Sequence, residues 1–200
     1  MKAKELYDLV LVTYPQAGEF MVCDLHKPCK ASRQCGSMAT KHLIDFDTVE
    51  CEYDRGKPSR SSVDAIAVAG NTFCFIELKG WVEYLKHNIP TTDGIKKKAN
   101  YNLKDKLAVS EGICVDLSGQ ENLFNDIPEV FILVTDIDAQ NGGIENFRSN
   151  LMALSQTSSS WISVCNQALD TELKRQISIS KYYTDCRHLD GMLERISVFD

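Results

Sequence analysis

The chain has 200 residues, of which 44% are hydrophobic and 25% are charged, as in a soluble globular protein. Its formal net charge of -6 argues against a protein whose whole surface binds nucleic acid, although five lysines gather between residues 96 and 106. No apolar run is long enough to span a membrane and the N-terminus does not resemble a secretory signal, so we expect a cytoplasmic protein.

The first 54 residues predict two helices, one strand and a cysteine-containing segment. Residues 3–13 predict a helix, and residues 22–36 form a cysteine-containing segment without clear periodicity. Residues 37–46 indicate a short helix. Residues 48–54 alternate between polar and apolar side chains, which predicts a strand.

The strongest local pattern is a hairpin. Val63–Ala69 and Thr72–Leu78 are two apolar runs, and the two residues between them, Gly70-Asn71, are typical of a tight hairpin turn. Both faces of these strands are apolar, which predicts a central place in the sheet.

The remaining elements are one strand and several helices. A helix is predicted over about 93–109, then a buried strand over 129–137, then helices over about 144–156, 161–176 and 185–196. The buried stripe of the first of these helices would be formed by Ile95, Ala99, Leu103 and Leu107. The order predicts an α/β fold with a mixed central sheet flanked by helices, in a single domain over 1–200 with its core at about 40–138.

The hairpin carries three charges in otherwise apolar strands. If Gly70-Asn71 is the turn, Asp64 lies opposite Glu77 on one face, and Lys79 shares that face because side chains alternate along a strand. Two opposed carboxylates repel, so a cation must offset them. These residues fit either a structural ion cluster with Lys79 or a site for a hard divalent cation.

Asp64, twelve intervening residues and Glu77-Leu78-Lys79 together resemble the signature of the PD-(D/E)XK nuclease superfamily, although Val63 stands where the family name has proline. The expected order of helix, three strands, helix and strand is similar to the core of that superfamily. The resemblance implies that Asp64, Glu77 and the backbone carbonyl of Leu78 bind Mg²⁺ or Mn²⁺, and that Lys79 orients the attacking water. Many members add a glutamate, and we consider Glu50 and Glu52 for that role.

Some members of the superfamily also use side chains of the helix that follows the motif. Lys97, Tyr101 and Lys104 recur at helical spacing within the lysine-rich stretch, and we consider them for contact with a nucleic-acid backbone. The alternative for each is a solvated helix face.

The eight cysteines include a cluster near the N-terminus. Some spacings there suit a zinc knuckle, and a cysteine and a histidine near the C-terminus could complete a structural zinc site. The layout also resembles that of superfamily nucleases in which cysteines from both ends of the chain hold an iron–sulfur cluster. The candidate ligands are Cys23, His26, Cys29, Cys35, Cys186 and His188. Otherwise these cysteines are reduced thiols, and Cys74 and Cys114 are expected to be buried.

We therefore expect a divalent-metal-dependent nuclease that hydrolyses phosphodiester bonds, in DNA rather than RNA. A homo-oligomer or a partner subunit would then help an acidic chain to hold its substrate. Two other hypotheses remain: a nuclease-like fold that is a non-catalytic binding or assembly module, and a zinc-organised interaction protein.

Overall fold

The computed structural model describes residues 1–21, 40–55, 60–80, 101–136 and 159–198, with side chains described from residue 168 onward in the last range. The helices are α1 (Ala3–Thr13), η1 (Pro15–Ala17, a 3-10 helix), α2 (Phe46–Tyr53), α5 (Leu103–Ser118), α6 (Leu123–Asp126), α8 (Ser159–Gln176) and α9 (Leu189–Val198). The strands are β1 (Phe20–Met21), β2 (His42–Asp45), β3 (Ala65–Ala69), β4 (Thr72–Lys79), β5 (Glu129–Thr135) and β6 (Ser180–Asp185).

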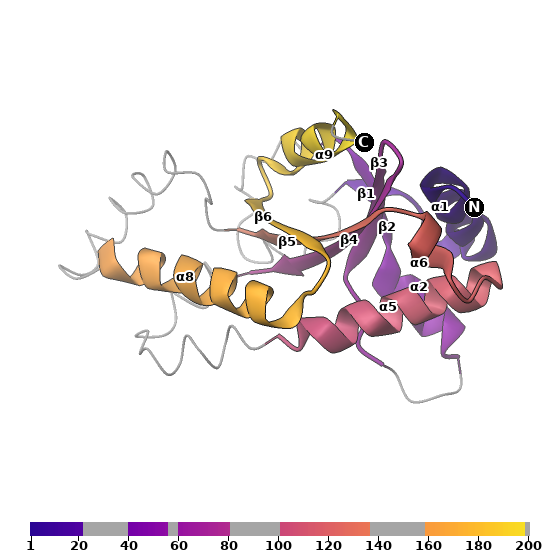
Figure 1. The fold of residues 1–200 in the computed structure, drawn as a ribbon, viewed down its shortest axis with the longest axis horizontal. Coiled ribbons are helices and arrows are strands. Elements are labelled where there is room, and N and C mark those ends of the chain that lie inside the picture. Colours follow the sequence, from indigo (N-terminus) through magenta and orange to yellow (C-terminus); the bar gives the residue numbers. More distant parts are fainter. Residues whose placement is uncertain (22–39, 56–59, 81–100, 137–158, 199–200) are drawn as a thin grey trace.

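The described strands form one mixed sheet in the order β1-β2-β3-β4-β5-β6. Strands β1 to β4 are antiparallel to their neighbours, whereas β4, β5 and β6 run parallel. Helices cover both faces (Figure 1), which confirms the α/β fold with flanking C-terminal helices. Strand β4 is where the antiparallel and parallel halves meet.

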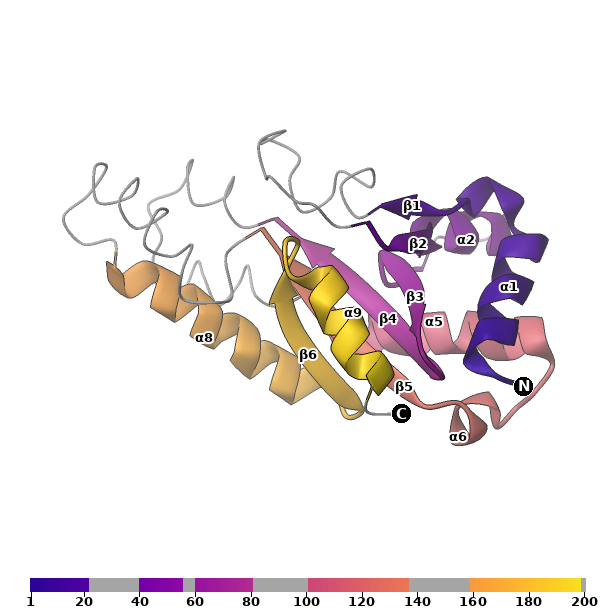
Figure 2. The ribbon, with the colours of Figure 1, turned by 90° about the horizontal axis from the view of Figure 1, so that it is seen from above.

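Each face of the sheet has its own core. On one face α1, α2, α5 and α8 pack over Ile66, Phe75 and Leu133, while on the other α9 packs over Ile76 and Ile132. Figure 2 shows α9 crossing the sheet on the side opposite to α5 and α8. The expectation that the hairpin is apolar on both faces is therefore confirmed.

The hairpin has the predicted register. Ala69 pairs with Thr72, and the same register continues to Ala65 opposite Ile76. Gly70 has a φ of 62°, a left-handed value that favours glycine. A positive φ at the first turn residue alone is typical of a type II′ turn, whose twist matches that of the strands.

The predictions for residues 37–46 and 48–54 are wrong. His42–Asp45 is strand β2 and pairs with both β1 and β3, whereas the expected strand over 48–54 is helix α2. Phe46, Val49 and Glu50 are buried at helical spacing, while Cys51 is exposed where an alternating strand would bury it.

The predicted bounds of the later helices also need correction. Helix α5 begins at Leu103, after Asn102 with a left-handed φ of 53°, and continues to Ser118, well beyond the expected end. Leu103 and Leu107 are buried as predicted, whereas Ile95 and Ala99 lie outside the described residues. Helix α8 confirms the expected helix over 161–176, α9 starts at Leu189, and the helix expected over 144–156 lies outside the described residues.

Strand β6 was not predicted at all, and it forms one edge of the sheet beside β5.

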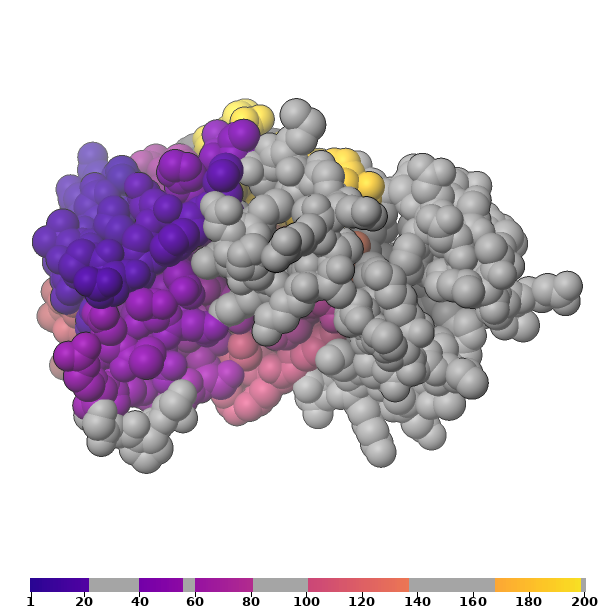
Figure 3. All heavy atoms as spheres, turned by 180° about the vertical axis from the view of Figure 1, so that it is seen from behind, coloured from indigo at the N-terminus to yellow at the C-terminus, as the bar shows by residue number. Residues whose placement is uncertain are grey.

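Seen from behind, residues of the N-terminal part, in indigo and purple, form one end of the molecule (Figure 3). None of the described helices is long and apolar enough to cross a membrane.

Candidate active site

The two acids of the hairpin are buried next to each other. Asp64 directly precedes β3 and is 6% exposed, while Glu77 on β4 is completely buried. The last pair of the ladder is Ala65 with Ile76, so Asp64 and Glu77 lie next to each other just beyond its end. The main-chain N–H of Leu78 donates to Asp64 Oδ2 at 2.7 Å, which fixes the first carboxylate against the strand of the second.

Two lysines neutralise these acids. Lys79 on β4 forms an ion pair with Glu77, and its ammonium also lies 5.0 Å from the centre of the Tyr101 ring. Lys106 on α5 reaches from the helix to the sheet: its Nζ is 2.8 Å from Glu77 Oε1 and 4.0 Å from Asp64 Oδ1. The ammonium of Lys106 thus contacts one carboxylate closely and lies within ion-pair distance of the other.

The environment shifts the titration of Glu77. Burial raises the pKa of Glu77, and the neighbouring Asp64 raises it further, while Lys79 and Lys106 oppose both effects. A buried acid with this balance of charges is typical of sites that bind a cation or exchange protons, and it also occurs in structural ion clusters.

Helix α5 and the segment before β3 are joined next to the acids. Ser110 is completely buried; its hydroxyl accepts a hydrogen bond from Val63 N at 3.0 Å and donates to Lys106 O at 2.9 Å. One side chain therefore connects the residue before Asp64 to the helical turn that carries Lys106.

The carboxylates of this cluster are some of the ligands that a hard divalent cation prefers. Mg²⁺ is commonly held by one or two carboxylates and several waters, and Asp64 and Glu77 can supply the carboxylates. The ammonium of Lys106, which faces both acids, marks a position that already favours a cation. Within the described part of the chain, no three His, Cys, Asp or Glu side chains lie together in a way that could hold a metal ion.

The two additional glutamates lie on α2, a helix, rather than on a strand as expected. Glu50 is buried and its Oε1 accepts a hydrogen bond from Arg60 N at 2.6 Å. The negative charge of Glu52 contributes to the raised pKa of Tyr14, second to burial of that ring. Neither glutamate makes a three-ligand cluster with Asp64 and Glu77 among the described residues.

The three residues considered for nucleic-acid contact do not share a helix. Tyr101 precedes α5 and lies under Lys79, whereas Lys104 is exposed on α5 with its main-chain N–H bonded to Gln176. Lys97 lies outside the described residues. Sequence reasoning missed Lys106, although it lies three residues after buried Leu103 and four before buried Ser110 and so borders the buried stripe.

The candidate metal ligands near the C-terminus have other partners. Cys186 is buried, with its Sγ 3.2 Å from the carbonyl oxygen of Thr135, and His188 Nδ1 lies 2.9 Å from Asp185 Oδ2. The other four candidates, between residues 23 and 35, lie outside the described residues. Cys74 and Cys114 are buried, as predicted.

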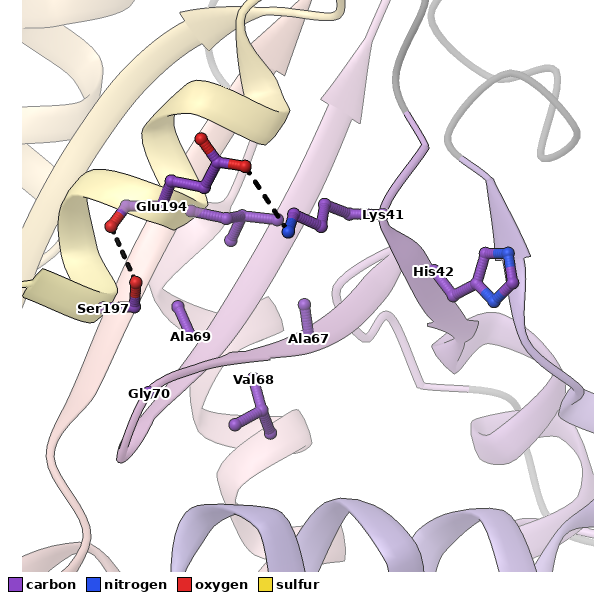
Figure 4. Close-up of a pocket in the computed structure, with 9 residues that line it drawn as sticks. Lys41, His42, Ala67, Val68, Ala69, Gly70, Glu194 and Ser197 are labelled. Carbon is purple, nitrogen blue, oxygen red and sulfur yellow. Dashed lines mark hydrogen bonds and ion pairs between the residues drawn. The ribbon is translucent and has the colours of Figure 1, made fainter.

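A pocket of 210 Å³ lies on the opposite face of the sheet, between β3 and α9. Lys41 and Glu194 face each other across it at 3.5 Å, and the ring of His42 points away from it (Figure 4). With its described charges already paired, this pocket marks the junction of α9 with the sheet, and it lies apart from the acids.

Comparison with known proteins identifies no relative. No family model matches the chain, and neither a curated protein nor a solved structure is significantly similar to it.

Proposed function

We propose that this chain is a divalent-metal-dependent nuclease of the PD-(D/E)XK type, in a cytoplasmic protein, with DNA as the preferred substrate. The observation that carries the proposal is the cluster of buried Asp64, buried Glu77 and Lys79 on one face of the hairpin. The predicted signature and the observed hairpin register support it together, because either of the two could occur alone by chance.

The roles follow from charge and position. Asp64, Glu77 and the Leu78 carbonyl would hold Mg²⁺ or Mn²⁺, which when bound polarises a phosphoryl oxygen and acidifies a water. Lys79 would orient the attacking water and stabilise the negative charge that develops on the phosphate. Lys106 would keep the two carboxylates together, and Tyr101 limits where the ammonium of Lys79 can move.

Cleavage assays on single- and double-stranded DNA and RNA, with Mg²⁺, Mn²⁺ or EDTA, test the proposal. We expect cleavage only with a divalent metal, and a loss of at least about a hundredfold in Glu77→Gln and Lys79→Met. Lys4→Met is the matched control, since Lys4 is an exposed lysine of α1. Cleavage that persists in EDTA, or in Glu77→Gln, would rule the mechanism out.

One observation favours a non-catalytic binding or assembly module. Asp64 and Glu77 are balanced by Lys79 and Lys106, so the cluster is neutral as it stands and could be purely structural. Thermal unfolding separates the two functions: Mg²⁺ or Mn²⁺ should raise the melting temperature of a metal-binding nuclease, and should leave that of a structural cluster unchanged.

The zinc-organised alternative depends on residues 23–35. Elemental analysis of the purified chain, native and Cys29→Ser, tests it directly. About one zinc per chain that is lost on substitution would support a structural zinc site, iron that is lost on substitution would support an iron–sulfur cluster, and a metal-free native chain would exclude both.

A further inference from the structure

A buried carboxylate at the end of β6 holds an arginine and a histidine side chain. Asp185 is 2% exposed, and both of its oxygens lie within 3.0 Å of His188 Nδ1. Its Oδ1 also accepts the main-chain N–H of Arg187 at 2.9 Å and lies 3.5 Å from Arg187 Nε. One fixed acid therefore orients both an imidazole and a guanidinium.

The strand register places this group on the same face as the candidate active site. Lys79 pairs with Thr135, and Thr135 pairs with Asp185, so the three residues form one row across β4, β5 and β6. Residues paired directly across parallel strands project from the same face. With neighbouring strands about 4.8 Å apart, the row places Asp185 roughly 10 Å from Lys79.

The side chains between the two ends of the row are polar, and Thr135 among them is completely buried. Thr135 Oγ1 lies 3.1 Å from the hydroxyl of Tyr183, the residue two positions before Asp185 on the same face. The row also lies at the carboxyl ends of the parallel strands, where α/β sheets commonly bind their ligands. A chain-like substrate that extends from Lys79 toward β6 would pass over the buried Thr135 and meet the exposed side chains that follow β6.

The chemistry of the group suits an anion. The side chains of Arg187 and His188 are 42% and 41% exposed, whereas the carboxylate that holds them is buried. Since Nδ1 of His188 faces Asp185, Nε2 is directed away from that carboxylate. The guanidinium of Arg187 can donate to phosphate oxygens, and Nε2 of His188 can do so whenever both ring nitrogens carry a proton.

We propose that Arg187 and His188, held by Asp185, form a phosphate-binding subsite for the nucleic-acid backbone next to the scissile phosphate. The inference rests on the proposed nuclease function, whose active site supplies the scissile position. The inference assigns these residues a role in binding rather than in bond cleavage, so the subsite can be disproved while the nuclease proposal stands. It also gives an acidic chain a local cationic contact on the substrate-facing side.

Binding of a fluorescently labelled oligonucleotide to the full chain in EDTA tests the subsite without requiring cleavage. We expect Arg187→Ala to weaken binding about five- to tenfold, His188→Ala about threefold, and Arg187→Ala to reduce the slope of log affinity against log salt by nearly one. Arg195→Ala is the matched control, because Arg195 is an exposed arginine of the neighbouring helix α9. It should change affinity less than twofold.

The outcomes distinguish the two proposals. Equal effects of Arg187→Ala and Arg195→Ala, or no binding by the native chain, would overturn the subsite. Metal-dependent cleavage with unchanged binding in Arg187→Ala would overturn the subsite and leave the nuclease proposal intact. Selective loss of binding in a chain that never cleaves would support the subsite and contradict the nuclease.

Discussion

Lys106 Nζ on α5 lies 2.8 Å from Glu77 Oε1 on β4, so a helix supplies a cation to the most deeply buried acid of the sheet. The same ammonium is 4.0 Å from Asp64. A divalent metal bound by both carboxylates would therefore compete with Lys106 for the same oxygens.

Removing this lysine should reveal the competition. Lys106→Met is expected to lower the free energy of unfolding by about 2–4 kcal/mol without metal, because it leaves a buried acid less well paired. It should also bind Mn²⁺ several-fold more tightly than the native chain. Chemical denaturation and calorimetric titration measure the two effects, and Lys104→Met is the control. A destabilised variant that Mn²⁺ does not restore would favour the structural ion cluster.

Ser110 should hold the acid-bearing segment in place. Ser110→Ala leaves the buried Val63 N–H without the hydroxyl that accepts it, so we expect a loss of about 1–3 kcal/mol in unfolding free energy. Ser118→Ala is a suitable comparison, because the half-buried Ser118 hydroxyl also donates to a carbonyl (Val115) and accepts a main-chain N–H (Gln120), but at the exposed end of α5. Equal stability of the two variants would contradict the role given to Ser110.

Glu129 should make the stability of the fold depend on pH. Burial, with a smaller effect from Glu111, raises the pKa of Glu129 from 4.5 to about 7. Because the pKa of Glu129 is higher in the folded chain than in the unfolded chain, the stability that its protonated form contributes is complete below pH 4.5. That stability is lost as the pH rises through 7. The Oε2 atom of Glu129 is buried without a hydrogen-bond partner, which adds to the cost of its charge.

Glu129→Gln removes that charge. At pH 8 the variant should be more stable than the native chain by about 1–2 kcal/mol, a value reduced to allow for partial solvent screening. At pH 4.5 the two should unfold at similar denaturant concentrations. Denaturation curves of both proteins at both pH values measure this effect. A stability difference between variant and native chain that does not vary with pH would contradict the raised pKa of Glu129.

Gly112 offers a test of the corrected helix α5. It lies in the helix interior, and an added Cβ would meet nothing within 4 Å. Gly112→Ala should therefore raise the free energy of unfolding by about 0.5–1 kcal/mol, measured by chemical denaturation. Gly119→Ala is the contrasting variant: its φ of 66° penalises a side chain, so destabilisation is expected there.

The parts predicted correctly were those fixed by local chemistry. The turn at Gly70-Asn71 determines the register of its own hairpin, and the register determines which charges share a face. The wrong strand prediction over 48–54 arose because the apolar positions of a strand and of a helix coincide over a few residues. Val49 and Tyr53 fit both an alternating strand and a helix, and only the buried Phe46 and the exposed Cys51 decide between them.

Other features depend on contacts between distant parts of the chain. Lys106 belongs to the site because α5 begins at Leu103, which places its side chain toward the sheet; a helix begun at 93 gave no reason to choose it. The predicted helix ended too early because Gly112, as a poor helix former, weakens the helical pattern of the sequence. Strand β6 is polar and lies at an edge, so its sequence carried little indication of burial.

The position of β4 between β3 and β5 has a consequence for motion. A strand bonded on both sides exchanges its amide hydrogens mainly when the whole domain unfolds, whereas edge strands such as β6 can detach in smaller openings. We therefore expect the amide hydrogens of β4 to exchange slowly, and Glu77 and Lys79 to stay aligned when the edge strands open.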